Sequence, residues 1–225
     1  MDRRDFLKQT GASLAVALST RSVPGQGHVV RPDLAALAER QGLSVTNRRA
    51  SPLHDGARNG VHLDEAPGQG LAFVEGLGFA NGTIDLDLRG RDVQGQSFVG
   101  VAFHAEDALT YDAVYFRPFN FRTEDPARRT HAVQYISMPT FYWPKLRAEH
   151  PETYEKGVTP VPDPNGWFHV RIDIAAPTVR VFVEDAREPS LVVTQLHGRG
   201  RGMVGLWADN YGGDFANLAI VPAGA

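Results

Sequence analysis

Strict alternation of apolar and polar residues is the feature that most constrains how this chain can fold. Residues 83–89 alternate three aliphatic side chains with polar or charged ones, and residues 168–174 and 179–184 repeat the pattern. Successive side chains of a β-strand point to opposite faces, so each segment has one apolar and one polar face. The three segments are therefore predicted to be strands of antiparallel sheets with one face on a core and the other in water.

Other short apolar segments complete an all-β pattern. Turn signals such as Asn81-Gly82 and Ala176-Pro177 separate most of them, and after residue 42 no segment keeps a helical period. Many short strands at such spacing predict an all-β, two-sheet antiparallel jelly-roll sandwich. The stretch 137–166 shows no pattern and is predicted to be a long functional loop. The further strand candidates are residues 98–104, 111–117, 132–136, 191–195 and 203–207.

Composition excludes several classes of protein. The 225 residues include no cysteine, so the chain has no disulfide, thiolate zinc site, iron–sulfur cluster or cysteine nucleophile. Lys and Arg total 23 against 26 Asp and Glu, and a net charge of -3 argues against a nucleic-acid partner. The eight histidines lack the spacing of zinc ligands, and no apolar run outside the first segment approaches the length of a membrane span.

The N-terminus has the layout of an export signal. The charged segment 3–8, Arg-Arg-Asp-Phe-Leu-Lys, precedes a weakly apolar stretch at 10–19, and it resembles the twin-arginine (Tat) signal. The resemblance implies a bacterial protein that is exported, already folded, to the periplasm or beyond. We predict a signal peptide at 1–26, a linker or short helix at 27–42 and one sandwich domain at 43–225. The alternative for the first segment is an amphipathic helix.

Two further motifs carry a family resemblance. Residues 79–88 read F-A-N-G-T-I-D-L-D-L, and residues 202–207 read G-M-V-G-L-W, followed by F-A-N-L. They resemble the concanavalin A-like lectin/glucanase superfamily, especially laminin-G-like modules and the 3-keto-disaccharide hydrolase domain, over about residues 43–222. This resemblance implies two curved sheets, with carbohydrate handled on the concave face of one sheet or in loops at its rim.

The chain departs from the catalytic pattern of the glucanases on this fold. Their strand motif is Glu-x-Asp-x-x-Glu, and the nearest segment here, residues 85–90, supplies two Asp residues and an Arg. Retaining glycosidases need two carboxyl groups about 5–5.5 Å apart. We therefore predict that this segment is a solvent-facing polar row. The fold also allows a structural calcium ion, for which Asp209, Asn210 and Asp214 are candidates; no other cofactor or metal is expected.

Alternation places four polar side chains on one face in mid-chain. His104, Tyr115, Arg117 and Gln134 are predicted to share a floor on which small residues leave room for a ligand. Such a set suits sugars, with His104 as candidate general base, Arg117 and Gln134 orienting the substrate and Tyr115 as platform. The alternative is structural: His104 is a satisfied buried group, Tyr115 closes a sheet edge, and Arg117 pairs with an aspartate, Asp112 or Asp87.

Three more residues extend this candidate site. Asn120 lies just after the strand predicted at 111–117, and Trp143 and Arg147 lie in the long loop predicted at 137–166. Trp143, with Tyr142, could stack on a sugar ring, and Arg147, with Lys145, could bind a carboxylate. The alternative is that these aromatic residues anchor the loop on the sandwich.

Two functions follow from this reading. The first is an exported glycoside hydrolase or lyase that acts on a simple or 3-keto glycoside, with His104 and Arg117 as catalytic residues. The second is a non-catalytic carbohydrate-binding module that uses the same face. Both predict a carbohydrate partner, and a fold alone does not decide between them.

Overall fold

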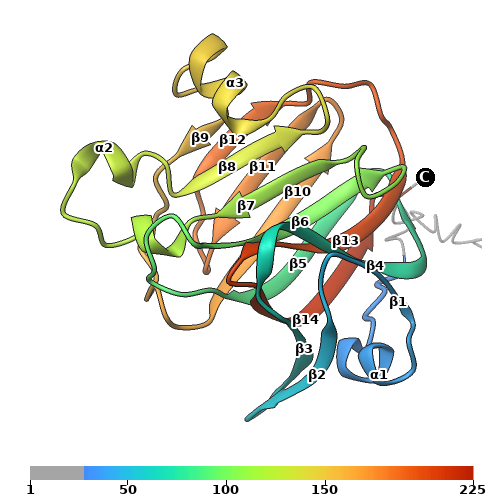
Figure 1. The fold of residues 1–225 in the computed structure, drawn as a ribbon. Helices are drawn as coiled ribbons and strands as arrows, with labels where there is room; N and C mark the ends of the chain where they lie inside the picture. The colour runs from blue at the N-terminus through green and yellow to red at the C-terminus, as the bar shows by residue number, and fades with distance from the viewer. Residues whose placement is uncertain (1–27, 225) are drawn as a thin grey trace, which may run out of the picture.

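Two antiparallel seven-stranded sheets face each other in the computed structural model, which describes residues 28–224 (Figure 1). The β5 sheet has the strand order β12-β11-β10-β5-β14-β3-β2, and the β6 sheet has the order β1-β4-β13-β6-β7-β8-β9. The elements in chain order are α1 (Leu34–Glu39), β1 (Leu43–Thr46), β2 (Ala50–Asp55), β3 (Arg58–Leu63), β4 (Ala66–Phe79), β5 (Gly82–Arg89), β6 (Ser97–Ala105), β7 (Asp112–Phe116), the 3-10 helix η1 (Pro118–Asn120), α2 (Pro126–Arg129), β8 (Val133–Ser137), α3 (Trp143–Glu149), β9 (Glu155–Lys156), β10 (Phe168–Ala175), β11 (Thr178–Val183), β12 (Leu191–Thr194), β13 (Gly202–Asn210) and β14 (Gly213–Pro222).

The β5 sheet follows the alternation of the sequence. Strand β10 alternates buried and partly exposed residues along its length, and β5 buries Ile84, Leu86 and Leu88 completely. In the register of the sheet, Ile172 of β10 lies opposite Ile84 of β5. The predicted strands at 83–89, 168–174 and 179–184 are therefore confirmed, because a sheet with one face in water preserves a period of two.

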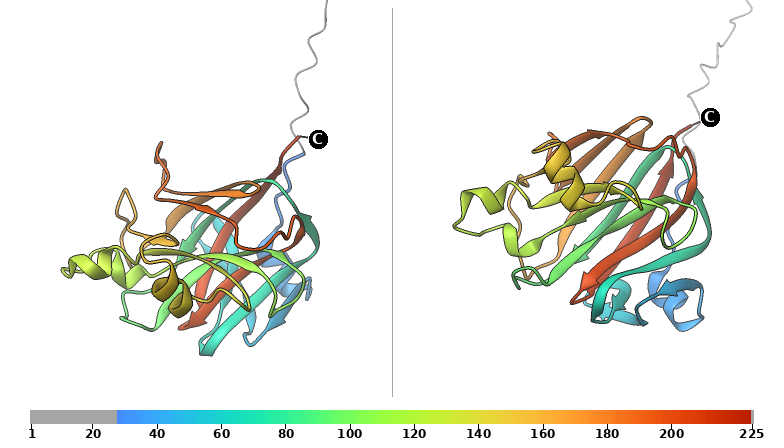
Figure 2. Two further views of the ribbon diagram at one scale, coloured as in Figure 1. Left: turned by 90° about the horizontal axis from the view of Figure 1, so that it is seen from above. Right: turned by 45° about the horizontal axis from the view of Figure 1, so that its top comes forward.

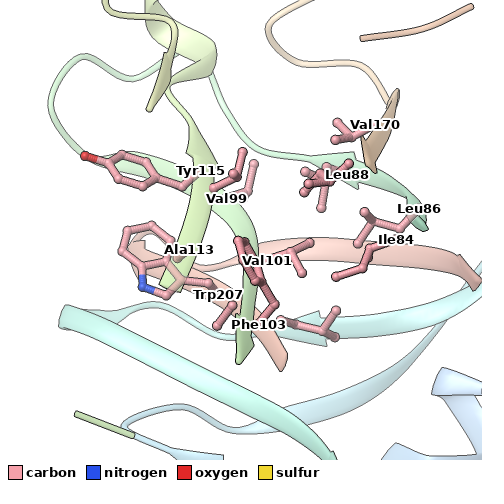
Figure 3. Close-up of a cluster of buried hydrophobic side chains, with 14 of the residues drawn as sticks. Ile84, Leu86, Leu88, Val99, Val101, Phe103, Ala113, Tyr115, Val170 and Trp207 are labelled. Carbon is pink, nitrogen blue, oxygen red and sulfur yellow. The ribbon is translucent and has the colours of Figure 1, made fainter. Parts of the chain in front are cut away.

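The central strands of the β6 sheet are buried on both faces. Every residue of β7 and β8 is buried. Figure 3 shows Val101 and Phe103 on the side that faces the β5 sheet, with Tyr115 and Trp207 on the opposite side. We call this second side the outer face of the β6 sheet. A strand that is covered on both sides has mostly apolar residues on both faces. This explains why apolar and polar residues do not alternate in the sequence of these strands.

Six strands were not predicted, namely β1, β2, β3, β4, β9 and β14. The longest, β4, contains glycines at positions 68, 70, 76 and 78, and Gly68 and Gly76 have positive φ angles of 77° and 73°. Glycine has no side chain to place on either face, and residues with positive φ interrupt the pleat. The two-residue alternation of apolar and polar residues is consequently lost in β4, although this strand lies inside the sheet.

The stretch 137–166 is not a structureless loop, in contrast to the prediction. It contains α3 and the two-residue strand β9, which pairs with β8. Leu146 of α3 is 1% exposed, so the helix is anchored on the sandwich by an apolar contact. Figures 1 and 2 show α2 and α3 on one side of the molecule and α1 on the other.

The two ends of the described chain lie together. Val30 and Ile220 form an antiparallel bridge with hydrogen bonds of 2.9 and 2.8 Å in the two directions. Between residues 28 and 224, no helix has the length and hydropathy needed to cross a membrane. The predicted signal peptide lies outside the described residues.

Candidate functional site

Arg117 is the centre of a buried polar cluster on the outer face of the β6 sheet. It follows β7 directly, and its side chain is only 6% exposed. Its Nη2 donates to the hydroxyl of Tyr115 at 2.7 Å and to Oε1 of Gln134 at 2.8 Å, and its Nη1 donates to the carbonyl of His131 at 3.0 Å. Tyr115 lies directly opposite Gln134 in the pairing of β7 with β8. The structure thus brings these three sequence-predicted residues, Tyr115, Arg117 and Gln134, together.

The carboxylate partner of this cluster is Glu155 on β9, which is buried. Arg147 of α3 donates to both of its oxygens, with distances of 2.7 Å from Nε and 2.6 Å from Nη2. Nη1 of Arg117 lies 3.6 Å from Oε2 of the same carboxylate. Arg117 therefore pairs with Glu155, and the alternative pairing with Asp112 or Asp87 is incorrect.

Trp143 is the exposed part of the cluster. It is the first residue of α3 and is 43% exposed, and its neighbour Tyr142 is 46% exposed. The guanidinium carbon of Arg147 lies 4.9 Å from the centre of the indole, and that of Arg117 lies 5.9 Å from it. The apolar contact of Leu146 and the two bonds from Arg147 to β9 hold the helix in place. The indole is therefore presented on a rigid support, with cationic groups beside it.

Asn120 connects the cluster to a further arginine. Its amide Nδ2 donates to the carbonyl of His131 at 3.0 Å, which is the group that also accepts from Arg117. Its Oδ1 accepts from Nε of Arg128 at 3.2 Å. Six of the seven predicted site residues are thus joined in one network: Tyr115, Arg117, Asn120, Gln134, Trp143 and Arg147.

Small residues on this face do not leave room for a ligand, in contrast to the prediction. The ring of Tyr115 stacks on Trp207 with centroids 4.6 Å apart, and both residues pair with Gly100 across the sheet. A Cβ atom on Gly100 would lie only 2.6 Å from that of Tyr115. The glycine therefore permits close approach of the protein's own aromatic side chains, which fill the space predicted for a ligand.

His104 is not on the floor where the sequence predicted it. Phe103 and His104 together face Val204 in the pairing of β6 with β13, which is a β-bulge, and His104 has a φ of 49°. A bulge re-aims the side chains that follow it. The imidazole is completely buried; its Nε2 donates to the carbonyl of Ala80 at 2.6 Å, and its Nδ1 accepts from the amide of Gln195 at 3.0 Å.

His104 belongs instead to an inner network at one end of the sandwich. Its centre is Asp112, which is fully buried and accepts from the hydroxyl of Ser137, from Gln195 at 3.2 Å and from Nη2 of Arg199 at 2.7 Å. Burial alone would raise the pKa of Asp112. The hydrogen bonds from Ser137 and Arg199, together with the charge of Arg199, outweigh burial and hold the pKa below its ordinary value.

The predicted polar row on β5 lies on the outer face of the β5 sheet, away from the Arg117 cluster. Asp87 accepts from Arg58 at 2.9 Å and from Asn217 at 2.8 Å. The ring of His169 lies between the row's two carboxylates, 3.3 Å from Asp85 and 3.0 Å from Asp87. Hydrogen bonds to Asp85 and Asp87 raise the pKa of His169 to about 10, so the imidazole is cationic at neutral pH. Both carboxylates are thereby engaged in ion pairs.

The residues proposed for a calcium ion are not brought together. Asp214 accepts from Nδ1 of His62 at 2.6 Å and from Nε of Arg89 at 2.8 Å. Asp209 lies on β13, opposite Phe98 of β6, and belongs to the other sheet. Over residues 28–224, no group of three or more His, Cys, Asp or Glu side chains is placed to hold a metal ion.

Two cavities flank Tyr211, where β13 turns into β14. One, of about 440 Å³, is lined by Glu65, Gln96 and Asn210 among others. The other, of about 240 Å³, is lined by residues that include His62 and Arg89. Neither cavity is lined by a residue of the predicted carbohydrate site, although the calcium candidates Asn210 and Asp214 line the first and the second, respectively.

The sequence did not single out Glu155, Arg128, His131 or Trp207 as functional residues. Glu155 lies on a strand of two residues, too short to produce a period, and it meets Arg117 only through the pairing of β8 with β9. Trp207 was expected only as part of a family motif. Its burial on the outer face could have been inferred from the absence of alternation in residues 203–207.

Solved structures share this fold at low sequence identity. The carbohydrate binding module CBM66 from Bacillus subtilis is 13% identical with a TM-score of 0.54, covering 80% of this chain and 95% of its own. A Bacillus subtilis protein of unknown function with a galectin-like fold is 11% identical, with a TM-score of 0.56 and coverages of 88% and 97%. The exoplasmic/lumenal domain of VIP36, in a form bound to Ca2+ and Man3GlcNAc, is 9% identical, with a TM-score of 0.55 and coverages of 86% and 89%.

These likenesses confirm the predicted jelly-roll sandwich. No protein-family model and no curated protein sequence matches the chain. The narrower resemblance to the 3-keto-disaccharide hydrolase domain therefore stays a prediction.

Proposed function

We propose that this chain, a sandwich with the concanavalin A-like lectin fold, binds carbohydrate at the exposed indole of Trp143. The observation that supports the proposal most directly is the contrast between Trp143 and the groups beneath it. A large aromatic side chain is 43% exposed above a network of hydrogen bonds that joins Tyr115, Arg117 and Gln134 and ties Arg147 to Glu155. Exposed aromatic residues on rigid supports are typical of binding surfaces, because they provide contact area at little entropic cost.

The polar groups beside Trp143 suit a sugar. The C–H face of a pyranose packs on an indole, and the hydroxyl groups exchange hydrogen bonds with guanidinium and amide groups. Arg147 is 36% exposed and lies against the indole, so it can donate to a bound sugar. The names of two proteins with the same fold, a carbohydrate binding module and a domain bound to Man3GlcNAc, agree with this class of ligand.

Binding without hydrolysis is the form of the proposal that the geometry favours. A retaining glycosidase needs two carboxyl groups about 5–5.5 Å apart beside the bond that breaks. Within residues 28–224, the carboxylate that contacts the cluster is Glu155, which is buried and accepts two hydrogen bonds from Arg147. A glycoside hydrolase or lyase acting on a simple or 3-keto glycoside is the alternative.

A screen separates these two functions. The full chain is tested by thermal shift against mono-, oligo- and 3-keto-saccharides, and each mixture that stabilises it is analysed by mass spectrometry. We expect stabilisation with no change in the mass of the sugar. A new product mass that depends on the protein would establish the enzyme, and no shift with any sugar would contradict both functions.

Replacing Trp143 with alanine is expected to weaken binding of the best saccharide from this screen by tenfold or more, about 1.4 kcal/mol, because the contact area of the indole is lost. Isothermal titration calorimetry measures the change. The matched control is Trp167→Ala, since Trp167 also lies beside two guanidinium groups, those of Arg58 and Arg89, but on the other sheet. Loss of binding in the Trp167 variant alone would place the site on the β5 sheet.

We also propose that the chain is exported by the twin-arginine route, on the basis of its first residues. Changing Arg3 and Arg4 together to lysine is expected to retain the protein in the cytoplasm of a bacterium with this pathway, because the arginine pair is what the receptor reads. Cell fractionation followed by immunoblotting measures the distribution. The control is Arg21→Lys, which changes a basic residue beyond the motif. Equal export of both variants would contradict the proposal.

A further inference from the structure

The charges around Trp143 are not balanced. Arg117 and Arg147 share one carboxylate, that of Glu155, and Arg117 also donates to a hydroxyl, an amide oxygen and a main-chain carbonyl. Two guanidinium groups facing one carboxylate leave one positive charge in excess. Buried and half-buried charges in proteins are normally paired, so an excess of this kind needs a reason.

The neighbouring histidine does not add a compensating charge. Nδ1 of His131 lies 3.1 Å from Oε1 of Glu155. Burial is the largest influence and lowers the pKa of His131; the charge of Glu155 raises it, the charges of Arg147 and Arg117 lower it, and the net shift is downward. The lowered pKa favours the neutral imidazole, which leaves the excess of positive charge unchanged.

A third guanidinium extends the excess. Arg128 donates to Oδ1 of Asn120 at 3.2 Å, to Oε1 of Gln94 at 3.1 Å and to the carbonyl of Phe119 at 3.3 Å, all of which are neutral. Within residues 28–224 it takes part in no salt bridge with a carboxylate of the described chain. The chain as a whole has a net charge of -3, so this concentration of positive charge is local and does not reflect the composition.

We propose that the ligand at Trp143 is an acidic oligosaccharide, whose carboxylate or sulfate group supplies the negative charge that the cluster lacks. This inference rests on the proposed carbohydrate-binding function and narrows its ligand class. The planar fork of a guanidinium matches the geometry of a carboxylate or sulfate group, and Arg147 is both exposed enough to reach one and adjacent to the indole. The sugar ring would pack on Trp143 while its acidic group pairs with Arg147.

The test compares acidic oligosaccharides with neutral forms of the same molecules. The probes are oligosaccharides of galacturonate, glucuronate, mannuronate and guluronate with their methyl esters, and sulfated galactose oligosaccharides with their desulfated forms. We expect at least one acid to bind the full chain tenfold or more tightly than its neutral form at low salt. The preference should fall as salt rises from about 0.01 to about 1 M, which shortens the Debye length from about 30 to about 3 Å.

Variants identify the side chain that pairs with the acidic group of the oligosaccharide. Arg147→Gln is expected to reduce the tenfold preference to less than threefold, and Arg147→Lys to retain part of it. The control, Arg171→Gln, removes an arginine of matching exposure from the β5 sheet, 37% against 36%, and should leave the preference unchanged. Circular dichroism checks folding. If Arg147→Gln fails to fold, Arg128→Gln tests the same excess of charge.

Two failures are distinguishable. Equal binding of acids and neutral forms, with both lost in Trp143→Ala, would overturn the acidic class and leave carbohydrate binding at Trp143 in place. Binding of no saccharide, or binding that Trp143→Ala does not weaken, would overturn the proposed function and this inference with it.

Discussion

Replacing Arg199 with alanine will lower the free energy of unfolding by about 3–5 kcal/mol at pH 7, the cost of removing one partner from a buried ion pair. Asp112 is completely buried, and Arg199 is the guanidinium that donates to it, at 2.7 Å. The same Nη2 donates to Ser137 at 2.6 Å, so that hydroxyl also loses a donor. Urea denaturation followed by fluorescence measures the loss.

The loss should depend on pH with a definite sign. In the native protein the pKa of Asp112 is lowered, so this carboxylate stabilises the fold above its unfolded pKa, and the contribution disappears as pH falls through its folded pKa. Without Arg199, burial dominates and raises the folded pKa. The variant then loses stability as pH rises above about 4, and the difference from the native protein is larger at pH 7 than at pH 4.

Two further variants serve as controls for this prediction. Arg201→Ala removes an exposed arginine from the same loop and should change stability by less than about 0.5 kcal/mol. Adding Asp112→Asn to Arg199→Ala should recover part of the loss, because a buried amide costs less than a buried charge. Equal losses in the Arg199 and Arg201 variants, or no recovery in the double variant, would contradict the assignment of Arg199 as the essential partner of Asp112.

Replacing Glu155 with glutamine will lower the free energy of unfolding by about 3 kcal/mol, the lower end of the range for breaking a buried pair, because one of its two partners can turn towards water. Arg147 is 36% exposed and can be resolvated, whereas Arg117 is only 6% exposed and is left without a carboxylate. We also expect faster hydrogen exchange in α3, which Arg147 ties to β9. Urea denaturation and hydrogen exchange measure the two effects.

The matched control is Glu149→Gln, which removes an exposed carboxylate at the end of α3 and should have little effect. Adding Arg117→Met to Glu155→Gln removes the buried cation that has lost its partner, so part of the stability should return. A loss of less than about 0.5 kcal/mol in the free energy of unfolding of Glu155→Gln would contradict the role of Glu155 as the buried partner of the arginines beside Trp143.

The sequence predicted four of the seven strands in each sheet, and the clearest predictions were β5 and β10. Strands β5 and β10 have one face in water, so alternation marked them clearly. Strand β4 lies between β1 and β13, and its glycines at positive φ hide it from any test of periodicity. The prediction of a two-sheet sandwich did not need this strand, since the remaining short strands and turns already excluded helical folds.

The candidate site was predicted in part. Tyr115 and Gln134 were placed on one face by alternation, and the register of β7 with β8 puts them opposite each other. His104 was assigned to that face by the same rule, but one extra residue in the β-bulge moves its ring away. Glu155 could not be found locally, because it meets Arg117 from a segment 38 residues further along the chain.

Because the central strands of the β6 sheet are buried on both faces, the two sheets differ in the substitutions that they can tolerate. Positions on β7 and β8 are constrained whichever way their side chains point, since the outer face is filled by Tyr115, Trp207 and the Arg117 cluster. The outer face of the β5 sheet carries ion pairs that remain partly exposed to water. A library that seeks new binding properties should therefore randomise the exposed positions of α3 and the solvent side of β10 and β11, and leave Leu146, Arg147 and both sides of β6 to β8 unaltered.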